Sequence, residues 1–214
     1  MLLNKEAALK LASYLLDIGA VQWRPQEPFR WASGWLSPIY TDNRLTLSFP
    51  QVRSFIKEVL REGVHQQGWR PEAIAGVATG GIPHGALLAD ALDLPFLYVR
   101  SSPKEHGLGN QIEGRLETGA LVLVVEDLVS TGQSSLRAVE ALRAKGAQVK
   151  YVLAIFDYDF PETRKAFDSH EVVLYSICNY DVCMEVAAGR GILKTNDMTI
   201  LRTWRESPAH WGLE

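Results

Sequence analysis

The chain has 214 residues, of which 47% are hydrophobic and 22% are charged, and its formal net charge at pH 7 is −3. These values are typical of a single globular domain and argue against long disordered segments. The slight acidic excess provides no general attraction to DNA or to an anionic membrane, so neither is expected as a partner. Two cysteines, Cys178 and Cys183, are too few for a disulfide framework or a structural zinc site.

The N-terminal segment is only partly apolar. Lys5, Glu6 and Lys10 interrupt it, so it lacks the pattern of a signal peptide. No apolar run approaches the roughly 20 residues that cross a bilayer. We therefore expect a cytoplasmic protein with reduced cysteines.

A helix is expected over residues 4–18. Apolar side chains recur at positions 8, 11, 12, 15 and 16, which share one helical face. Asn4 is expected to cap this helix, and Gly19 is expected to end it in a left-handed conformation.

The next segment, residues 22–43, is too irregular for a helix and is expected to hold short strands. A second helix is expected from Ser48, because Ser48 and Gln51 have the spacing of a capping box around Pro50.

From residue 73 onward, short apolar segments alternate with helical ones. Strands are expected at residues 73–79, 96–100, 120–127, 149–156 and 171–177, and helices at residues 83–91, 133–145 and 161–168. This alternation predicts an α/β fold in which a mostly parallel five-stranded sheet carries helices on both faces. The whole chain, residues 1–214, is expected to be one domain with a core at about 66–178.

Ligands bind to sheets of this kind beyond the carboxyl ends of the strands. Functional residues are therefore expected just after residues 79, 100, 127 and 156.

The most informative segment follows the strand at 120–127. This apolar strand ends in two acids, Glu126 and Asp127, and a loop of small hydroxylic residues around Gly132 leads into a helix. Backbone N–H groups at a helix start form an anion site, while the carboxylates suit vicinal hydroxyls or a hydrated cation. A phosphate beside a diol describes a ribose 5-phosphate. An ordinary strand–helix turn would explain the hydroxyls and the glycine but not the acid pair.

The same segment, residues 124–135, resembles the phosphoribosyl pyrophosphate (PRPP) motif of type I phosphoribosyltransferases. The resemblance implies their fold, with a small hood formed by residues 1–65 and 179–214. It also implies a set of PRPP-binding residues in this segment, namely Glu126, Asp127, Leu128, Val129, Ser130, Thr131, Gly132, Gln133 and Ser134.

A glycine-rich loop follows the strand at 96–100. Residues 104–114 read Lys-Glu-His-Gly-Leu-Gly-Asn-Gln-Ile-Glu-Gly, which resembles the catalytic loop of orotate phosphoribosyltransferases. The resemblance implies that Arg100, Lys104 and His106 bind PRPP, and that Lys104 and His106 are also catalytic. It further implies a homodimer in which the 100–115 loop reaches the partner's site.

Residues 29–44 resemble the segment that shapes the orotate pocket in the same family. Lysines that are frequent there are replaced by Ala32, Trp35 and Leu36, so Arg44 is the nearest cation for the orotate carboxylate. Ser130 is expected near the orotate edge.

Further departures from the family pattern also remove cations. Ser101 and Ser102 follow the first loop arginine, where some members carry a second basic residue. Residues 157–159 read Asp-Tyr-Asp, where some members carry an arginine that contacts orotate, and we expect these to be solvated loop residues.

Two other segments resemble the family. Residues 79–83, Thr-Gly-Gly-Ile-Pro, match a loop whose backbone contacts pyrophosphate, often through a non-proline cis or strained peptide. Residues 191–208 resemble the tail of bacterial members and are expected in the hood or on a surface helix.

The implied reaction is the transfer of ribose 5-phosphate from PRPP to orotate in pyrimidine biosynthesis. Glu126 and Asp127 would hold the ribose hydroxyls and stabilise the cationic ribosyl centre. Mg²⁺ would be held mainly through PRPP and water, with no direct side-chain ligand assigned. Lys104 and His106 would close over the pyrophosphate and exclude water.

Two alternatives remain open. One is a phosphoribosyltransferase for another nucleobase, which the missing cations favour and the 104–114 loop opposes. The other is a non-catalytic PRPP-sensing regulator that binds nucleic acid, which would need a basic face that the net charge of −3 does not indicate.

Overall fold

The computed structural model describes residues 1–31, 34–102 and 111–212. Its centre is a six-stranded sheet in the order β10–β9–β8–β5–β6–β7. The strands are β5 (Ala73–Val77), β6 (Phe96–Val99), β7 (Ile112–Glu113), β8 (Val122–Val129), β9 (Tyr151–Asp157) and β10 (Val173–Asn179). All neighbours pair in parallel except β6 and β7, which pair antiparallel.

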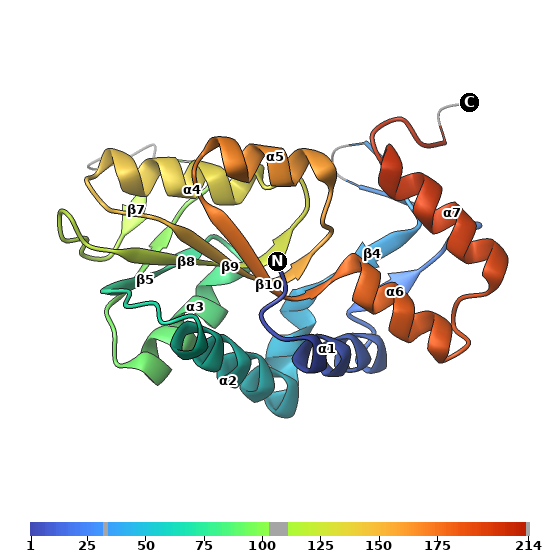
Figure 1. Cartoon of the computed structure of the whole chain (residues 1–214), viewed down its shortest axis with the longest axis horizontal. Coiled ribbons are helices and arrows are strands. Elements are labelled where there is room, and N and C mark those ends of the chain that lie inside the picture. The colour runs from blue at the N-terminus through green and yellow to red at the C-terminus, as the bar shows by residue number, and fades with distance from the viewer. Residues whose placement is uncertain (32–33, 103–110, 213–214) are drawn as a thin grey trace.

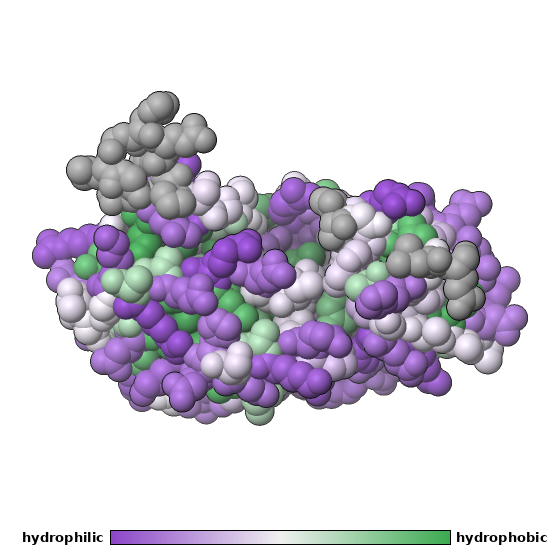
Figure 2. Space-filling view, turned by 90° about the horizontal axis from the view of Figure 1, so that it is seen from above, coloured by the Kyte–Doolittle hydropathy of each residue, from purple (hydrophilic) through white to green (hydrophobic). Residues whose placement is uncertain are grey.

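Helices cover both faces of this sheet, as Figure 1 shows. One face carries α1 (Lys5–Asp17), α2 (Pro50–Gln66) and α3 (Gly81–Leu92), and the other carries α4 (Gln133–Ala144) and α5 (Pro161–Ser169). Seen from the α4 and α5 side, hydrophilic residues dominate the surface and apolar patches are scattered (Figure 2). The predicted α/β architecture is confirmed.

The remaining elements pack at one end of the sheet (Figure 1). They are β1 (Val21–Trp23), β2 (Phe29–Arg30), β3 (Leu36–Ser37), β4 (Ile39–Thr41), the 3₁₀ helix η1 (Asn43–Ser48), α6 (Tyr180–Gly189) and α7 (Thr195–Glu206). Short strands within residues 22–43 were expected, and so was a helix near the C-terminus. Trp204 of α7 is fully buried and donates its Nε1–H to the carbonyl of Leu36 at 2.9 Å, which ties this helix to β3.

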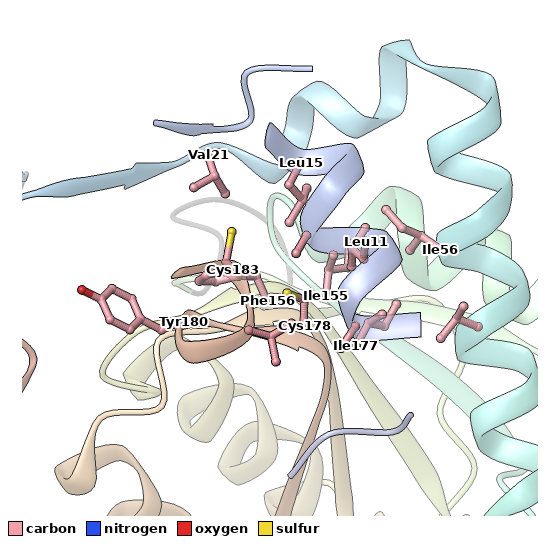
Figure 3. Close-up of a cluster of buried hydrophobic side chains, with 14 of the residues drawn as sticks. Leu11, Leu15, Val21, Ile56, Ile155, Phe156, Ile177, Cys178, Tyr180 and Cys183 are labelled. Atoms are coloured by element: carbon pink, nitrogen blue, oxygen red, sulfur yellow. The ribbon is translucent and has the colours of Figure 1, made fainter. Parts of the chain in front are cut away.

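The apolar face of α1 packs into the larger core cluster. Figure 3 displays Leu11 and Leu15 of α1 in one cluster with Ile155 of β9 and with Cys178 and Cys183. Both cysteines are buried and free, as their number suggested. Burial raises the pKa of the Cys178 thiol to about 12, so this thiol stays protonated at neutral pH.

The end signals of α1 are confirmed. Asn4 accepts the Ala7 N–H at 2.9 Å through its side chain. Gly19 adopts φ +70°, the left-handed conformation that ends a helix without a steric cost for glycine.

Three local expectations were wrong. The sheet has six strands rather than five, because Ile112 and Glu113, within the 100–115 segment, pair with Val99 and Tyr98. A strand of two residues is too short to show an alternating apolar pattern in the sequence. The capping box at Ser48 is absent, because Ser48 ends η1 and Phe49 precedes α2 without a side-chain cap. The strand β8 runs past the acid pair to Val129, because β9 continues to pair with it up to Asp157.

No helix within the described ranges is long and apolar enough to cross a membrane.

Candidate active site

Glu126 lies inside β8 and is almost completely buried. The hydroxyl groups of Ser134 and Ser135 each donate to its Oε2 at 3.1 Å, and the Asp127 N–H donates to Oε1 at 3.3 Å. Burial, together with the neighbouring charge of Asp127, raises the pKa of Glu126 well above its usual range. Glu126 therefore joins the strand to the first turn of α4, and Ser134, expected at the phosphate, is turned toward this acid.

Asp127 is the more accessible acid of the pair, and it faces the loop that precedes α3. A Cβ atom on Gly80 would lie well under 3.0 Å from the Asp127 carboxylate, so the loop backbone passes directly against that carboxylate. Burial also raises the pKa of Asp127, although the charge of Arg44 opposes the effect. The structure thus places the predicted ribose site and the predicted pyrophosphate loop in contact.

The loop at 79–81 is packed closely on the sheet. The peptide between Ala78 and Thr79 is cis, which agrees with the resemblance. A Cβ atom on Gly81 would collide with the carbonyl oxygen of Val125 in β8. The two glycines therefore allow this backbone to reach the strand that carries the acid pair.

The predicted phosphate site, residues 130–134, connects β8 to α4. Gly132 has φ +77°, and a Cβ atom there would lie 2.6 Å from the ring of Phe167. Thr163 of α5 donates its hydroxyl to the carbonyl of Ser130 at 2.5 Å. The first N–H groups of α4 have no partner within the helix, which leaves them available to a phosphate.

The cations predicted for PRPP lie after β6. Arg100 donates its backbone N–H to Gln111, and its guanidinium lies 3.8 Å from Glu113 of β7. Lys104 and His106, both predicted to be catalytic, lie outside the described residues, so their roles stay predictions.

Arg44, the cation proposed for the orotate carboxylate, lies on η1. Its guanidinium binds both oxygens of Asp42, at 2.7 and 2.9 Å, and its side chain is 63% exposed. Its neighbour Asn43 donates to the carbonyl of Asp127, so η1 brings Arg44 to the side of the molecule that carries the acid pair. Its assignment to orotate stays a prediction.

Three residues at the site went unnoticed in the sequence. Asn43 donates from its side chain to the carbonyl of Asp127 at 2.6 Å, and Thr46 and His84 are buried beside it. Asn43 and Thr46 are separated by only two residues, but His84 and Asp127 are distant in the chain, so no sequence motif marked the group.

The residues after β9 correct another expectation. Asp157, Tyr158 and Asp159 are buried, not solvated: Trp204 of α7 packs against the Tyr158 ring, and arginines of α5 and α7 lie against Asp159. Tyr158 donates to the hydroxyl of Thr41 at 3.1 Å and so links the segment after β9 to β4.

Asp159 is surrounded by cations. Arg164 of α5 binds both its carboxylate oxygens, and Arg205 of α7 lies 3.5 Å from Oδ2. Burial raises the pKa of Asp159, but the two guanidinium groups outweigh it, so this pKa lies below its usual value. Arg164 and Arg205 are thus paired with Asp159, a carboxylate of the same chain.

Asp157 is expected to destabilise the folded protein at neutral pH. Burial raises its pKa from 3.8 to about 6. The folded state then binds the proton more tightly than the unfolded state, so stability declines as pH rises from about 4 to about 6. In Asp157→Asn, Oδ1 can still accept the Asp159 N–H, a 2.8 Å bond in the native chain.

We therefore expect Asp157→Asn to be more stable than the native protein above pH 6, by up to about 3 kcal/mol. The gain should shrink toward pH 4. Chemical denaturation at pH 4, 5, 6 and 8 measures it, with the exposed Asp168→Asn as the control. A gain that is the same at every pH would contradict the titration of Asp157.

The sequence matches a family described as phosphoribosyl transferase domain over residues 45–183. An orotate phosphoribosyltransferase of Bacteroides fragilis is 52% identical over 200 residues, covering 94% of each chain. That of Listeria innocua is 50% identical over 203 residues, covering 95% of this chain and 97% of the other.

A solved structure leads to the same family. The orotate phosphoribosyltransferase of Aeropyrum pernix superimposes with a TM-score of 0.73 at 32% identity, covering 86% of this chain and 99% of the other. The acid pair lies in the last four residues of β8, and the hydroxylic loop and the Gly80 loop follow β8 and β5. All three are therefore at the carboxyl-end edge of the sheet, where folds of this kind bind their ligands. The chain therefore belongs to the phosphoribosyltransferase family and, within it, to the orotate phosphoribosyltransferases.

Proposed function

We propose that the protein transfers the 5-phosphoribosyl group of PRPP to N1 of orotate, forming orotidine 5′-monophosphate and pyrophosphate. The observation that carries this proposal is the contact between Asp127 and the loop at Gly80, next to the start of α4. One ligand that holds a 5-phosphate, a ribose diol and a pyrophosphate matches these three elements. Membership of the family supports the base assignment.

The 5-phosphate would lie on the backbone of residues 130–134, where the N-terminus of α4 favours an anion. Gly132, in this loop, lies against Phe167, which leaves no room there for a larger side chain. The hydroxyl of Thr131 is a further donor to the phosphate.

The ribose hydroxyls would donate to Asp127, the acid of the pair that is less buried. During the reaction the bond from C1 to the pyrophosphate oxygen breaks, and its electron pair leaves with pyrophosphate. N1 of orotate, ionised, supplies the electron pair of the new bond. A carboxylate beside C1 stabilises the positive charge that develops between these events.

Magnesium is proposed as the metal. The ion would be held mainly by PRPP and by water, and the nearby Asp127 carboxylate favours a cation beside the pyrophosphate loop without being assigned as a direct ligand. When bound, the ion would neutralise the charge of the leaving pyrophosphate. Lys104 and His106 would add cations over the same group, and the proton that pyrophosphate takes up would come from one of them or from water.

The remaining proposals concern the protein's setting. We place the enzyme in the cytoplasm, in the pathway to UMP, and its buried, free cysteines suit a reducing compartment. We also propose a homodimer in which residues 100–115 reach the partner's site. Tyr40, Leu45 and Phe49, each more than a third exposed near η1, support an apolar contact surface there.

Absorbance assays test the function directly. With PRPP and magnesium, the protein should consume orotate but not uracil, hypoxanthine or adenine. Chelation of magnesium should abolish turnover, and Lys104→Ala should lower kcat by about 100-fold, because a cation opposite the leaving group is lost. Lys145→Ala, at the exposed end of α4, is the matched control and should keep full activity.

Other outcomes identify the alternatives. Turnover of another base without turnover of orotate would indicate that the missing cations had changed the base specificity. Binding of PRPP without turnover of any base would favour a regulator.

A further inference from the structure

Asn43 ties the segment before α2 to the acid pair. It is the first residue of η1, it is 1% exposed, and its Nδ2 donates to the carbonyl of Asp127 at 2.6 Å. The two residues are 84 positions apart in the chain. Because a carbonyl oxygen only accepts, this contact fixes which end of the Asn43 amide faces β8.

A second contact extends the connection to α3. The Thr46 hydroxyl donates to the carbonyl of Asn43 at 2.5 Å, and Thr46 Oγ1 lies 3.3 Å from His84 Nε2. A hydroxyl has one proton, and Thr46 gives it to Asn43. His84 is therefore the donor in the second contact and carries its proton on Nε2.

His84 stays neutral in this position. Burial, together with the charge of Arg53, lowers its pKa to about 4. Two hydrogen bonds therefore run in series, from His84 to the Thr46 hydroxyl and from Thr46 to the backbone carbonyl of Asn43, and these two polarise one another. They hold the backbone of Asn43, whose side-chain amide separately donates to the carbonyl of Asp127.

The two ends of this chain lie at the two halves of the PRPP site. His84 is in the first turn of α3, directly after the loop at 79–81, and Asp127 carries the carboxylate that contacts Gly80. Asn43 Oδ1 is buried and has no hydrogen-bond partner within the described part of the chain. An unsatisfied buried acceptor costs stability, so this arrangement is not optimised for stability alone.

We propose that Asn43, Thr46 and His84 are positioning residues that hold the Asp127 carboxylate in register with the 79–81 loop. They act through the backbone of Asp127 and do not touch substrate. The inference rests on the proposed function, because its main readout is turnover of PRPP with orotate. A displacement of reacting groups by about 1 Å can lower a rate by about 100-fold.

Two isosteric substitutions test the chain. Asn43→Leu removes the donor to Asp127 and should lower kcat by about 10- to 100-fold, with KM for orotate within about twofold of the native value. Thr46→Val breaks the middle contact and should lower kcat by about 3- to 10-fold. Thr46→Ser keeps the hydroxyl and should restore kcat to within about twofold.

The matched control is Thr203→Val. The Thr203 hydroxyl also donates to a backbone carbonyl, that of Thr199 at 3.1 Å, but on the exposed face of α7. It should leave kcat unchanged. Melting temperatures of all variants separate a loss of positioning from a loss of fold.

Equal kcat values for Thr46→Val, Asn43→Leu and the native protein would overturn the inference. So would a fall in kcat that only follows the fraction of unfolded protein. If the native protein did not turn over orotate, the proposed function would fail instead, and PRPP affinity measured by calorimetry would then decide the inference. Native affinity in both isosteric variants would overturn it.

Discussion

Replacement of Gly80 by alanine is expected to lower kcat/KM for PRPP by about 100-fold or more while the protein stays folded. Gly80 has φ −68°, so its backbone conformation is open to alanine. The added methyl group would meet the Asp127 carboxylate at a distance that real Cβ atoms do not tolerate. The carboxylate has to turn away, which removes it from the ribose and the pyrophosphate.

Replacement of the neighbouring Gly81 by alanine is expected to lower stability, in contrast to Gly80→Ala. In Gly81→Ala the methyl group meets the carbonyl oxygen of Val125, which belongs to the sheet and cannot turn away. We expect a loss of stability of about 1–3 kcal/mol there. Gly189→Ala, with nothing within 4 Å, is the control for both.

Steady-state kinetics of the three variants measure the loss of activity, and thermal denaturation measures the loss of stability. If Gly80→Ala kept kcat/KM within threefold, the Asp127 carboxylate would not need its present place against the loop, and its role at the ribose would be lost.

Asp127→Asn is expected to lower kcat by about 100- to 1,000-fold and to raise the melting temperature at neutral pH. The amide keeps the size of the side chain but removes the charge that we propose stabilises the cationic ribosyl centre. Burial raises the pKa of both acids, so the folded state prefers the protonated pair. Ionisation at neutral pH therefore costs stability, and the amide removes that cost.

The same argument predicts how the stability gain depends on pH. Below the carboxyl pKa of the unfolded chain both states are protonated, so the native protein and Asp127→Asn should converge in acid. Asp90→Asn, an exposed change on α3, should alter neither rate nor stability. An Asp127→Asn variant that was both slow and less stable at neutral pH would indicate a structural role for this acid.

The sequence alone predicted those parts of the site whose residues are neighbours in the chain. Glu126, Asp127 and the hydroxylic loop stand together because one apolar strand leads into one helix start, and the structure brings this segment to the loop at Gly80. The α/β alternation likewise depends on local apolar runs. Polarity was a poor guide to exposure where tertiary packing overrides it, as at Asp157, which is polar but 3% exposed.

The sequence was insufficient where the partners are distant. Nothing next to Asn43 indicates that its side chain meets the backbone of Asp127, and nothing next to Asp159 indicates Arg205. Such pairs depend on how the hood elements fold back on the sheet, which no local pattern records. Lys104 and His106 are still known from their motif alone.

The strand order has a consequence for how the protein folds. In the sheet β5 lies between β6 and β8, so the contact of Gly80 and Gly81 with β8 exists only after the chain has returned from β6 through β7. The chain must lose the conformational entropy of closing such long loops before the contacts between distant strands can stabilise it. Parallel strand pairings of this kind therefore form slowly. The contact between the 79–81 loop and β8 therefore depends on a non-local strand pairing and not on local structure alone. After dilution from denaturant, recovery of activity measures formation of the complete site. Recovery of helical content measures only the formation of local secondary structure.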